Sequence, residues 1–265
     1  MTESLETLLE RWNEREAELG VAAEARSFWA FGVADRRPVL LIHGLAGSPA
    51  DFRDFARFWN DRGHTVLCAL LPGHASTPEE LARATFAQLL ERTIEAFDAL
   101  EHPGVAPIVI GQSLGGVLGV RLVTRRRASH FVALAPALRP FVGWRALALL
   151  PLAVVNPPLA RHTARWQMEA RRGIEETRRS LASVQCPLFV LHSRDDRSVS
   201  VRGSHELYEE ARSEIKHRYI LDGHEHVLST APDRERLVFE PVAEWIRATP
   251  PGAGTRSWDP RRASD

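Results

Sequence analysis

Short apolar runs alternate with helical stretches along most of this sequence, and this order limits the folds open to it. The run "PVLLIHG" (38–44) ends in glycine, and "DFRDFARFWNDRG" (51–63) follows it with aromatic side chains on one helical face. The order recurs in "HTVLCALLPG" before the helix "PEELARATFAQLLERTIEAFDAL", and further strands are expected in "APIVIGQS", "SHFVALAP", "CPLFVLHSRDD" and "IKHRYILDG". Apolar strands without polar alternation are typical of parallel sheets covered on both faces. We therefore predict an α/β fold with a mostly parallel, doubly wound sheet and helices on both faces.

The alternation is interrupted once and is absent near both ends, which suggests a division of the chain. Residues 28–135 and 181–247 are expected to form one α/β core, and 136–180 to be a cap or lid inserted into it. Leucines and Trp12 recur at helical spacing in 1–27, which predicts an accessory helix. Residues 248–265 hold turn formers and charges without periodicity, so we expect a disordered tail.

Composition excludes several classes of protein. Lys+Arg and Asp+Glu both number 34 among 265 residues, so there is no basic excess of the kind that nucleic-acid binding requires. The two cysteines, Cys68 and Cys186, border apolar runs and are expected to be buried free thiols. The acidic N-terminus has no apolar segment of a secretory signal, so a cytoplasmic protein is expected. We expect a monomer or homodimer.

The stretch "PIVIGQSLGGVLGV" (107–120) places Ser113 between two glycines, in the spacing G-x-S-x-G. A β-branched apolar strand precedes the motif and an amphipathic helix follows it, as in a sharp strand-to-helix turn that exposes a nucleophilic serine. A dinucleotide fingerprint does not fit, because Ser113 stands where that motif needs its second glycine. A phosphate-binding P-loop does not fit either, because no Gly-Lys-Ser/Thr follows.

A serine nucleophile needs a histidine base and an acid that orients it, and candidates for both lie downstream. Asp195 and Asp196 follow one apolar strand, and His224 and His226 follow the next. The chain order Ser, Asp, His is the one that this topology uses. Carboxyl ends of parallel strands meet at one edge of the sheet, so these side chains are expected to converge.

Five motifs resemble those of the α/β-hydrolase superfamily, and in particular small bacterial carboxylesterases and monoacylglycerol lipases. The resemblance covers residues 38–247 and is carried by "LLIHGLAGSPADF", "LPGHASTPEEL", "GQSLGGV", "SRDDRSV" and "HVLSTAPDRERL". It implies an α/β-hydrolase fold with Asp196 as the acid and Asp195 as the reserve, although Ser193 stands where the family has glycine. It implies His226, directly before a valine, as the base, with His224 as an extra histidine.

The same resemblance implies an oxyanion hole made by two backbone amides. The family takes one amide from the residue after His-Gly and one from the residue after the nucleophile, which here are Leu45 and Leu114. His43 and His74 are interpreted as structural, and Ala75 replaces the last glycine of a Gly-His-Gly motif. No metal or cofactor is expected for this chemistry.

The insertion has two halves of different character. In "FVGWRALALLPLAVV" the apolar side chains follow helical spacing, which predicts a short helix with an apolar face toward the domain. This face either covers the domain core or, through Phe141, Trp144 and Leu147, lines a substrate pocket. Apolar runs here are shorter than the roughly 20 residues that span a bilayer, so no stable membrane insertion is expected. The second half is rich in arginine and glutamate, and i, i+4 pairs such as Arg171–Glu175, Arg172–Glu176 and Glu175–Arg179 predict a solvated helical face.

Together these features predict a serine hydrolase that cleaves small-molecule carboxylic esters of short to medium acyl chains through Ser113, His226 and Asp196. A monoacylglycerol lipase, a lysophospholipase or a thioesterase would use the same residues. A non-catalytic binding protein on this scaffold is a further alternative, although such proteins usually have a damaged triad.

Overall fold

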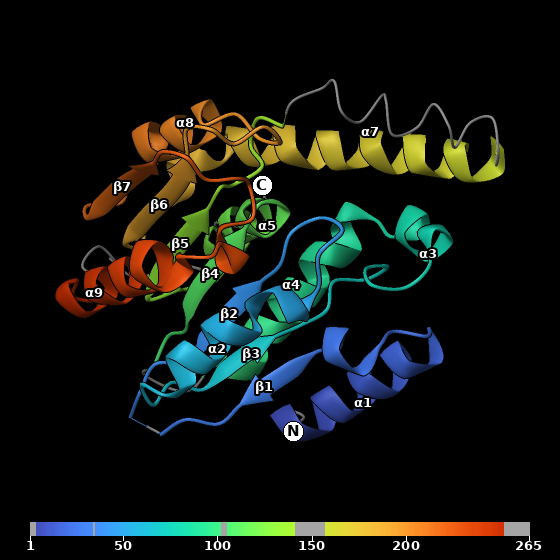
Figure 1. The fold of residues 1–265 in the computed structure, drawn as a ribbon, viewed down its shortest axis with the longest axis horizontal. Coiled ribbons are helices and arrows are strands. Elements are labelled where there is room, and N and C mark those ends of the chain that lie inside the picture. Colours follow the sequence, from blue (N-terminus) through green and yellow to red (C-terminus); the bar gives the residue numbers. More distant parts are fainter. Residues whose placement is uncertain (1–3, 34, 102–104, 141–156, 252–265) are drawn as a thin grey trace.

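Within the residues that the structure describes, seven strands form one sheet in the order β1-β3-β2-β4-β5-β6-β7 (Figure 1). The computed structural model describes residues 4–33, 35–101, 105–140 and 157–251. The strands are β1 (Phe28–Ala30), β2 (Val39–Ile42), β3 (Val66–Cys68), β4 (Ile108–Gln112), β5 (His130–Leu134), β6 (Leu188–Ser193) and β7 (Lys216–Leu221). Neighbouring strands from β3 to β7 are parallel, and only β1 runs antiparallel, against β3. The predicted mostly parallel sheet is confirmed.

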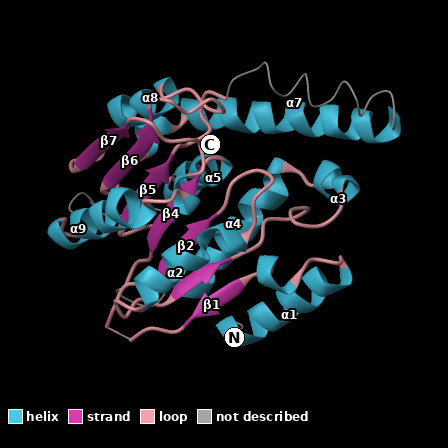
Figure 2. Ribbon diagram, in the orientation of Figure 1, coloured by secondary structure: helices cyan, strands magenta, loops and turns pink. Residues whose placement is uncertain are grey.

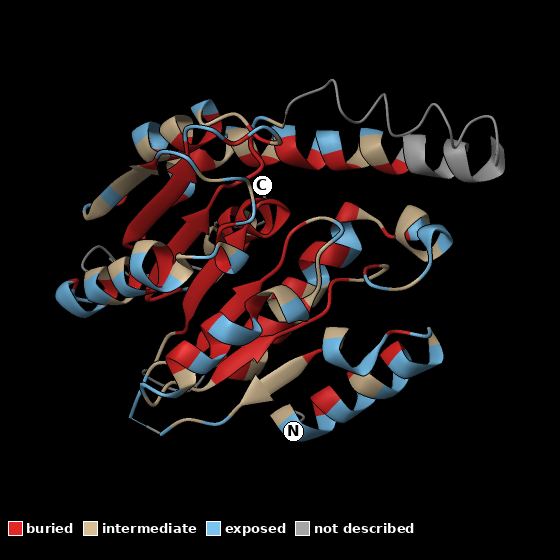
Figure 3. Ribbon diagram, viewed as in Figure 1, coloured by how far each residue is buried: buried red, intermediate tan, exposed pale blue. Residues whose placement is uncertain are grey.

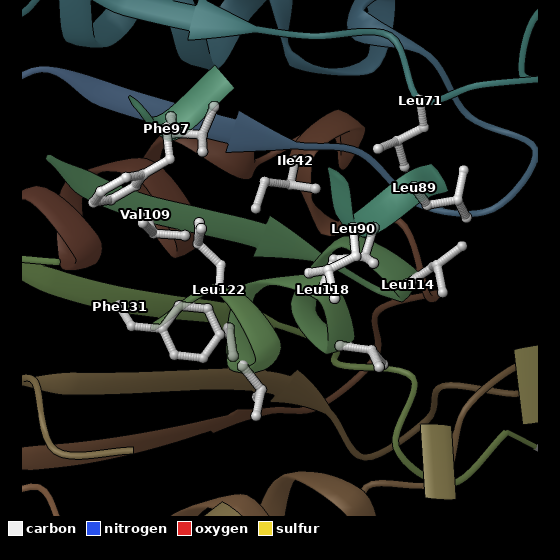
Figure 4. Close-up of a cluster of buried hydrophobic side chains, with 14 of the residues drawn as sticks. Ile42, Leu71, Leu89, Leu90, Phe97, Val109, Leu114, Leu118, Leu122 and Phe131 are labelled. Carbon is white, nitrogen blue, oxygen red and sulfur yellow. The ribbon is translucent and has the colours of Figure 1, made fainter. Parts of the chain in front are cut away.

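Helices cover both faces of this sheet, as Figure 2 shows. Alternate residues of strands β2 to β6 enter two separate cores: Leu40 and Ile42 of β2 belong to one, and Val39 and Leu41 to the other. The first core packs α1 (Leu5–Glu18), α4 (Phe86–Leu100), α5 (Leu114–Val123) and α8 (Arg202–Glu210) against the sheet, and part of it is drawn in Figure 4. The second packs α2 (Arg53–Asn60) and α9 (Glu240–Ala248), with stacked rings of Phe55 and Phe239. The apolar strands thus lie between two layers of helices.

Burial follows this layering (Figure 3). The central strands β2 to β6 are buried throughout, whereas the edge strands β1 and β7 are mostly half-buried. Cys68 and Cys186 are both buried free thiols, as predicted. Within the described ranges, no helix combines the length and the apolar character needed to cross a bilayer.

The predicted single helix between Pro78 and Leu100 is wrong in one respect, because it is two helices. α3 (Pro78–Arg83) ends where Ala84 turns to extended backbone, and α4 begins after Thr85. Thr85 and Gln88 form a capping box in which each satisfies a backbone amide of the other, and this starts a new helix. The short strand β1 was not expected, since three half-buried residues leave no clear period in a sequence.

The described part of the segment predicted to be an insertion, 136–180, contains one long helix, α7 (Pro157–Arg179), which packs against α3, α4 and α5 (Figure 1). Arg172 pairs with Glu176 as predicted, but Glu175 pairs with Arg178 instead of Arg171 or Arg179. Arg178 also pairs with Glu206 of α8, so its guanidinium lies between two carboxylates. Phe141, Trp144 and Leu147 lie outside the described residues, as does most of the predicted tail (252–265).

Short turns of helix join the main elements. Four are 3₁₀ turns, η1 (Ala23–Ala25), η2 (Pro49–Phe52), η3 (Leu181–Ser183) and η4 (Leu228–Thr230), and η5 (Glu235–Phe239) is a π-helical turn that leads into α9. α1 is anchored at its end by Glu16, whose carboxylate accepts hydrogen bonds from the amide and hydroxyl of Ser27. An N-terminal helix is therefore present where the leucine spacing predicted it.

Candidate active site

Ser113 lies at the tip of the turn between β4 and α5. Its backbone has φ 56° and ψ −116°, which is a strained conformation for a residue with a Cβ atom. Gly111 and Gly115 make the turn possible: a Cβ on Gly111 would lie 2.2 Å from the Gly115 carbonyl oxygen, and one on Gly115 would lie 2.0 Å from that of Ile42. The two glycines of the motif are therefore required by close packing of the turn against itself and against β2.

A continuous hydrogen-bond chain joins Ser113 to the loops after β6 and β7. Ser113 Oγ lies 2.7 Å from His226 Nε2, and His226 Nδ1 lies 2.6 Å from Asp196 Oδ2. Because the carboxylate can only accept, His226 carries its proton on Nδ1, and Nε2 accepts from the serine hydroxyl. The other carboxylate oxygen of Asp196 accepts from the amides of Ser198 and Val199, at 2.7 and 2.9 Å.

The alternative acid and base are occupied elsewhere. His224 Nε2 lies 3.0 Å from a carboxylate oxygen of Asp233, and Nδ1 lies 2.8 Å from the Asp222 carbonyl oxygen. These acceptors, the Asp222 carbonyl first, raise the pKa of His224 above its ordinary value. Asp195 accepts from the Gly223 amide at 2.6 Å and so braces the loop after β7. The structure thus brings Ser113, His226 and Asp196 together, and neither His224 nor Asp195 joins them.

One residue of this network was not anticipated from the sequence. His192, at the end of β6, is buried, and its Nε2 lies 3.0 Å from Asp196 Oδ2, the same oxygen that accepts from His226. Ser204 Oγ holds the other ring nitrogen of His192 at 2.6 Å. Burial favours the protonated carboxyl of Asp196, but the hydrogen bonds from His192, His226 and the Val199 amide outweigh it and hold the pKa of Asp196 well below its ordinary value. Asp196 is therefore an ionised, fixed acceptor.

The two predicted oxyanion amides lie beside Ser113. Leu45 follows β2 and Leu114 begins α5, and both border the cavity that reaches Ser113 and His226. Gly44 lets the loop approach closely, since a Cβ there would lie 3.1 Å from Cβ of Ser113. Among the described residues, neither the Leu45 amide nor the Leu114 amide donates a hydrogen bond. Free amides at the start of a helix and in a fixed turn are suited to bind a negatively charged oxygen.

A small apolar cavity of about 70 Å³ opens over Ser113. α7 lines it with Trp166, Ala170 and Ile174, which recur every fourth residue and so share one face of the helix. These residues were not predicted, because the arginines and glutamates around them indicated a solvated helical face and drew attention away from the opposite face. Their spacing was the signal that could have identified them. Within the ranges that the structure describes, no cluster of three or more His, Cys, Asp and Glu is placed to hold a metal ion.

This arrangement has the parts of nucleophilic catalysis at an acyl group. A serine hydroxyl that donates to an imidazole can lose its proton as it attacks a carbonyl carbon, if a buried carboxylate stabilises the imidazolium. Unpaired amides beside the serine can stabilise the oxyanion that forms. An apolar cavity beside both can hold the acyl chain of a substrate.

The sequence and the fold are similar to those of known hydrolases. A family model described as the alpha/beta hydrolase fold matches residues 37–156, and a model described as serine aminopeptidase, S33, matches residues 156–233. A carboxylesterase of Bacillus subtilis is 23% identical over 233 residues, which are 79% of this chain and 92% of that protein. A monoacylglycerol lipase of Mycolicibacterium smegmatis is 25% identical over 255 residues, covering 82% and 90% of the two chains. The solved structure of a metagenome-derived lipolytic enzyme superposes with a TM-score of 0.74 at 23% identity, covering 86% of this chain and all of that one.

Proposed function

The chain belongs to the α/β-hydrolase superfamily, and from this premise we propose that it is a serine hydrolase that cleaves carboxylic esters. One observation carries the proposal: the hydrogen-bond chain from Ser113 through His226 to Asp196, with distances of 2.7 and 2.6 Å. The similarity to a carboxylesterase along most of the chain supports ester hydrolysis among the reactions open to such a site.

In the proposed reaction, Ser113 Oγ attacks the ester carbonyl carbon while His226 Nε2 takes the hydroxyl proton. The carbonyl π electrons move onto oxygen, and the amides of Leu45 and Leu114 hydrogen-bond to the resulting oxyanion. Asp196 keeps the His226 proton on Nδ1 and stabilises the imidazolium. The oxyanion collapses and the C–O bond to the alcohol breaks, and the alcohol leaves with the proton from His226. Water then attacks the acyl-enzyme in the same way, which releases the acid and restores Ser113.

The cavity supports a preference for short to medium acyl chains. Its volume of about 70 Å³ and its apolar lining from α7 suit a short alkyl chain. Each methylene that enters such a cavity contributes up to ~0.8 kcal/mol, so specificity should rise with chain length until the cavity is full. A monoacylglycerol lipase is the second candidate, favoured by the similarity to the mycobacterial relative along most of the chain.

A panel of substrates tests this proposal. We expect kcat/KM for p-nitrophenyl esters to rise from acetate to a short or medium chain and to fall for palmitate, with monoacylglycerols accepted and triacylglycerols poor. Thioesters of the same acyl groups should be cleaved less efficiently than the oxygen esters. A profile that is flat or peaks at palmitate contradicts the small-pocket carboxylesterase, and a strong preference for thioesters identifies a thioesterase.

A further inference from the structure

His43 is a buried histidine that touches the loop of the proposed oxyanion hole. It directly follows β2 and is 0% exposed, and Gly44 and Leu45 come next in the chain. His43 Nδ1 lies 2.9 Å from the carbonyl oxygen of Gly44. On the other side of the ring, the amide of Leu71 donates to His43 Nε2 at 3.0 Å. Each ring nitrogen thus has one backbone partner.

These two partners fix the tautomer of His43. The amide of Leu71 can only donate, so Nε2 must be the unprotonated nitrogen that accepts. A neutral imidazole then carries its proton on Nδ1, and the carbonyl of Gly44 can only accept it. Burial, with a smaller contribution from His74, lowers the pKa of His43 to about 3. The ring therefore remains neutral, with Nδ1 as the donor, throughout the neutral pH range.

The carbonyl that His43 holds belongs to the same peptide group as the amide of Leu45. The Gly44 oxygen also accepts from the Gly47 amide at 3.2 Å, across a tight turn in which Ala46 has φ 60°. In a trans peptide the C=O and N–H bonds point in opposite directions. With its oxygen turned toward His43 and Gly47, this peptide must direct the Leu45 N–H away from them. The cavity over Ser113 lies beside Leu45.

We propose that His43 is a positioning residue that locks the Gly44–Leu45 peptide so that the Leu45 amide is directed at the oxyanion. A lock is needed here because glycine resists rotation of its flanking peptides less than any other residue. A rotated peptide would turn the carbonyl oxygen toward the substrate oxygen and repel its negative charge. This inference rests on the proposed function, because it concerns the transition state of that reaction.

Two substitutions of His43 distinguish a role in orienting the Gly44–Leu45 peptide from a role in packing alone. In His43→Asn, the amide nitrogen can take the place of Nδ1 and still donate to the Gly44 oxygen. In His43→Gln, the longer side chain can accept from the Leu71 amide in place of Nε2, but its donor to Gly44 is lost. We expect His43→Asn to keep kcat within about fivefold and His43→Gln to lose on the order of 10- to 100-fold in kcat with little change in KM, because an oxyanion donor acts in the transition state.

Binding of an alkyl trifluoromethyl ketone provides a readout that a purely structural role would not move. This inhibitor accepts the serine oxygen at its carbonyl carbon and leaves an oxyanion in the hole. Its inhibition constant should rise in His43→Gln by about the same factor as kcat/KM falls. A matched control is His130→Gln, which alters another buried histidine at the start of β5, where its ring contacts the Thr249 carbonyl. That variant should lower the melting temperature without changing kcat or inhibitor affinity.

The outcomes distinguish this inference from the function on which it rests. A wild-type protein that neither hydrolyses esters nor binds the ketone overturns both. An active wild type in which His43→Gln keeps its kcat, or in which both His43 variants lose activity equally, overturns the lock alone. If neither variant folds, long-range ¹H–¹⁵N NMR of histidine-labelled wild-type protein decides the matter: a proton on Nδ1 of His43 supports the lock, and a proton on Nε2 overturns it.

Discussion

Asp196 and Asp195 are adjacent in the chain, yet their carboxylates accept hydrogen bonds from different groups. Asp196 is buried and accepts from two imidazoles and two backbone amides, whereas Asp195 accepts from the amide of Gly223. The same contrast separates His226, which contacts Ser113, from His224, which contacts Asp233. In each pair, one residue belongs to the hydrogen-bond chain that reaches Ser113, and the other supports a loop.

Substitution of each pair should therefore give unequal effects. His226→Ala should lower kcat by roughly 10³-fold or more, because Ser113 loses its base, while His224→Ala should cost less than tenfold. Asp196→Asn and Asp195→Asn should show the same contrast. Steady-state kinetics with one p-nitrophenyl ester, and thermal unfolding of each variant, measure this. A larger loss in His224→Ala or Asp195→Asn would mean that the assignment of acid and base is displaced by one or two residues.

The pairing of Ser113, His226 and Asp196 could be anticipated because it depends on topology. Side chains that follow the carboxyl ends of parallel strands lie at the same edge of the sheet. The motifs identified the three strands after which the serine, the aspartate and the histidine lie. The contact of His192 with Asp196 could not be anticipated in this way. In a strand buried on both faces, the sequence does not tell which side of the sheet a given side chain takes. The contact of His43 with the Gly44 carbonyl could not be predicted either, because it depends on the orientation of the imidazole ring, which the sequence does not specify.

Among the secondary-structure elements, the alternation of strands and helices in the sequence was enough to predict the sheet but not the helix in residues 136–180. Apolar periodicity located six of the seven strands, and it failed for β1, which is short and half-buried at the edge. The division between α3 and α4 is set by the local capping box of Thr85 and Gln88, which interrupts a continuous helical pattern. α7 has a charged outer face and an inner face formed by Trp166, Ala170 and Ile174. The many charged residues predicted the outer face, and the apolar inner face was missed.

α7 should control acyl-chain length, and Ala170 is the position that tests it. Ala170 is 3% exposed and borders the cavity over Ser113, so Ala170→Leu adds three carbon atoms where the acyl chain would lie. We expect kcat/KM for acetate to stay within about threefold and that for the best medium-chain ester to fall by at least about tenfold, since each excluded methylene is worth ~0.8 kcal/mol.

Met168→Ala is the matched control on the same helix, because Met168 is 67% exposed. That variant should leave the whole chain-length profile unchanged. Labelling of Ala170→Leu by a small fluorophosphonate should also remain, since Ser113 and His226 are untouched. An unchanged profile in Ala170→Leu would place the acyl chain somewhere other than beneath α7.

At the scale of the whole molecule, buried neutral histidines make the fold sensitive to acid. Burial lowers the pKa of His43 to about 3 and that of His130 to about 4, against an ordinary value of 6.5. At a pH between the lowered pKa and 6.5, each of these histidines is protonated in the unfolded chain but neutral in the folded protein. The free energy of unfolding therefore rises with pH over this range. The stability that these two neutral histidines contribute is therefore fully present above about pH 6.5, and it is lost as the pH falls through about 4 for His130 and about 3 for His43. The pKa of His224 is raised instead, so that residue opposes the trend.

We expect the free energy of unfolding, measured with urea, to fall by on the order of 1–2 kcal/mol for each of these two histidines between pH 7 and pH 5. His130→Gln should be less stable than the wild type at pH 7 but should lose less stability on acidification, because it removes one group that takes up a proton. Equal slopes in the two proteins would show that His130 does not remain neutral in the folded state.

Ser113 is the proposed nucleophile of an ester hydrolase, and active-site labelling is the measurement that decides this role. Wild-type protein and Ser113→Ala would be treated with a fluorophosphonate, the labelled residue identified by peptide mass spectrometry, and hydrolysis of p-nitrophenyl butyrate measured on the same samples. We expect a label on Ser113 in the wild type, and in Ser113→Ala the loss of both labelling and hydrolysis with an unfolding transition close to that of the wild type. Persistent hydrolysis in folded Ser113→Ala, or a label on another residue, would contradict this role.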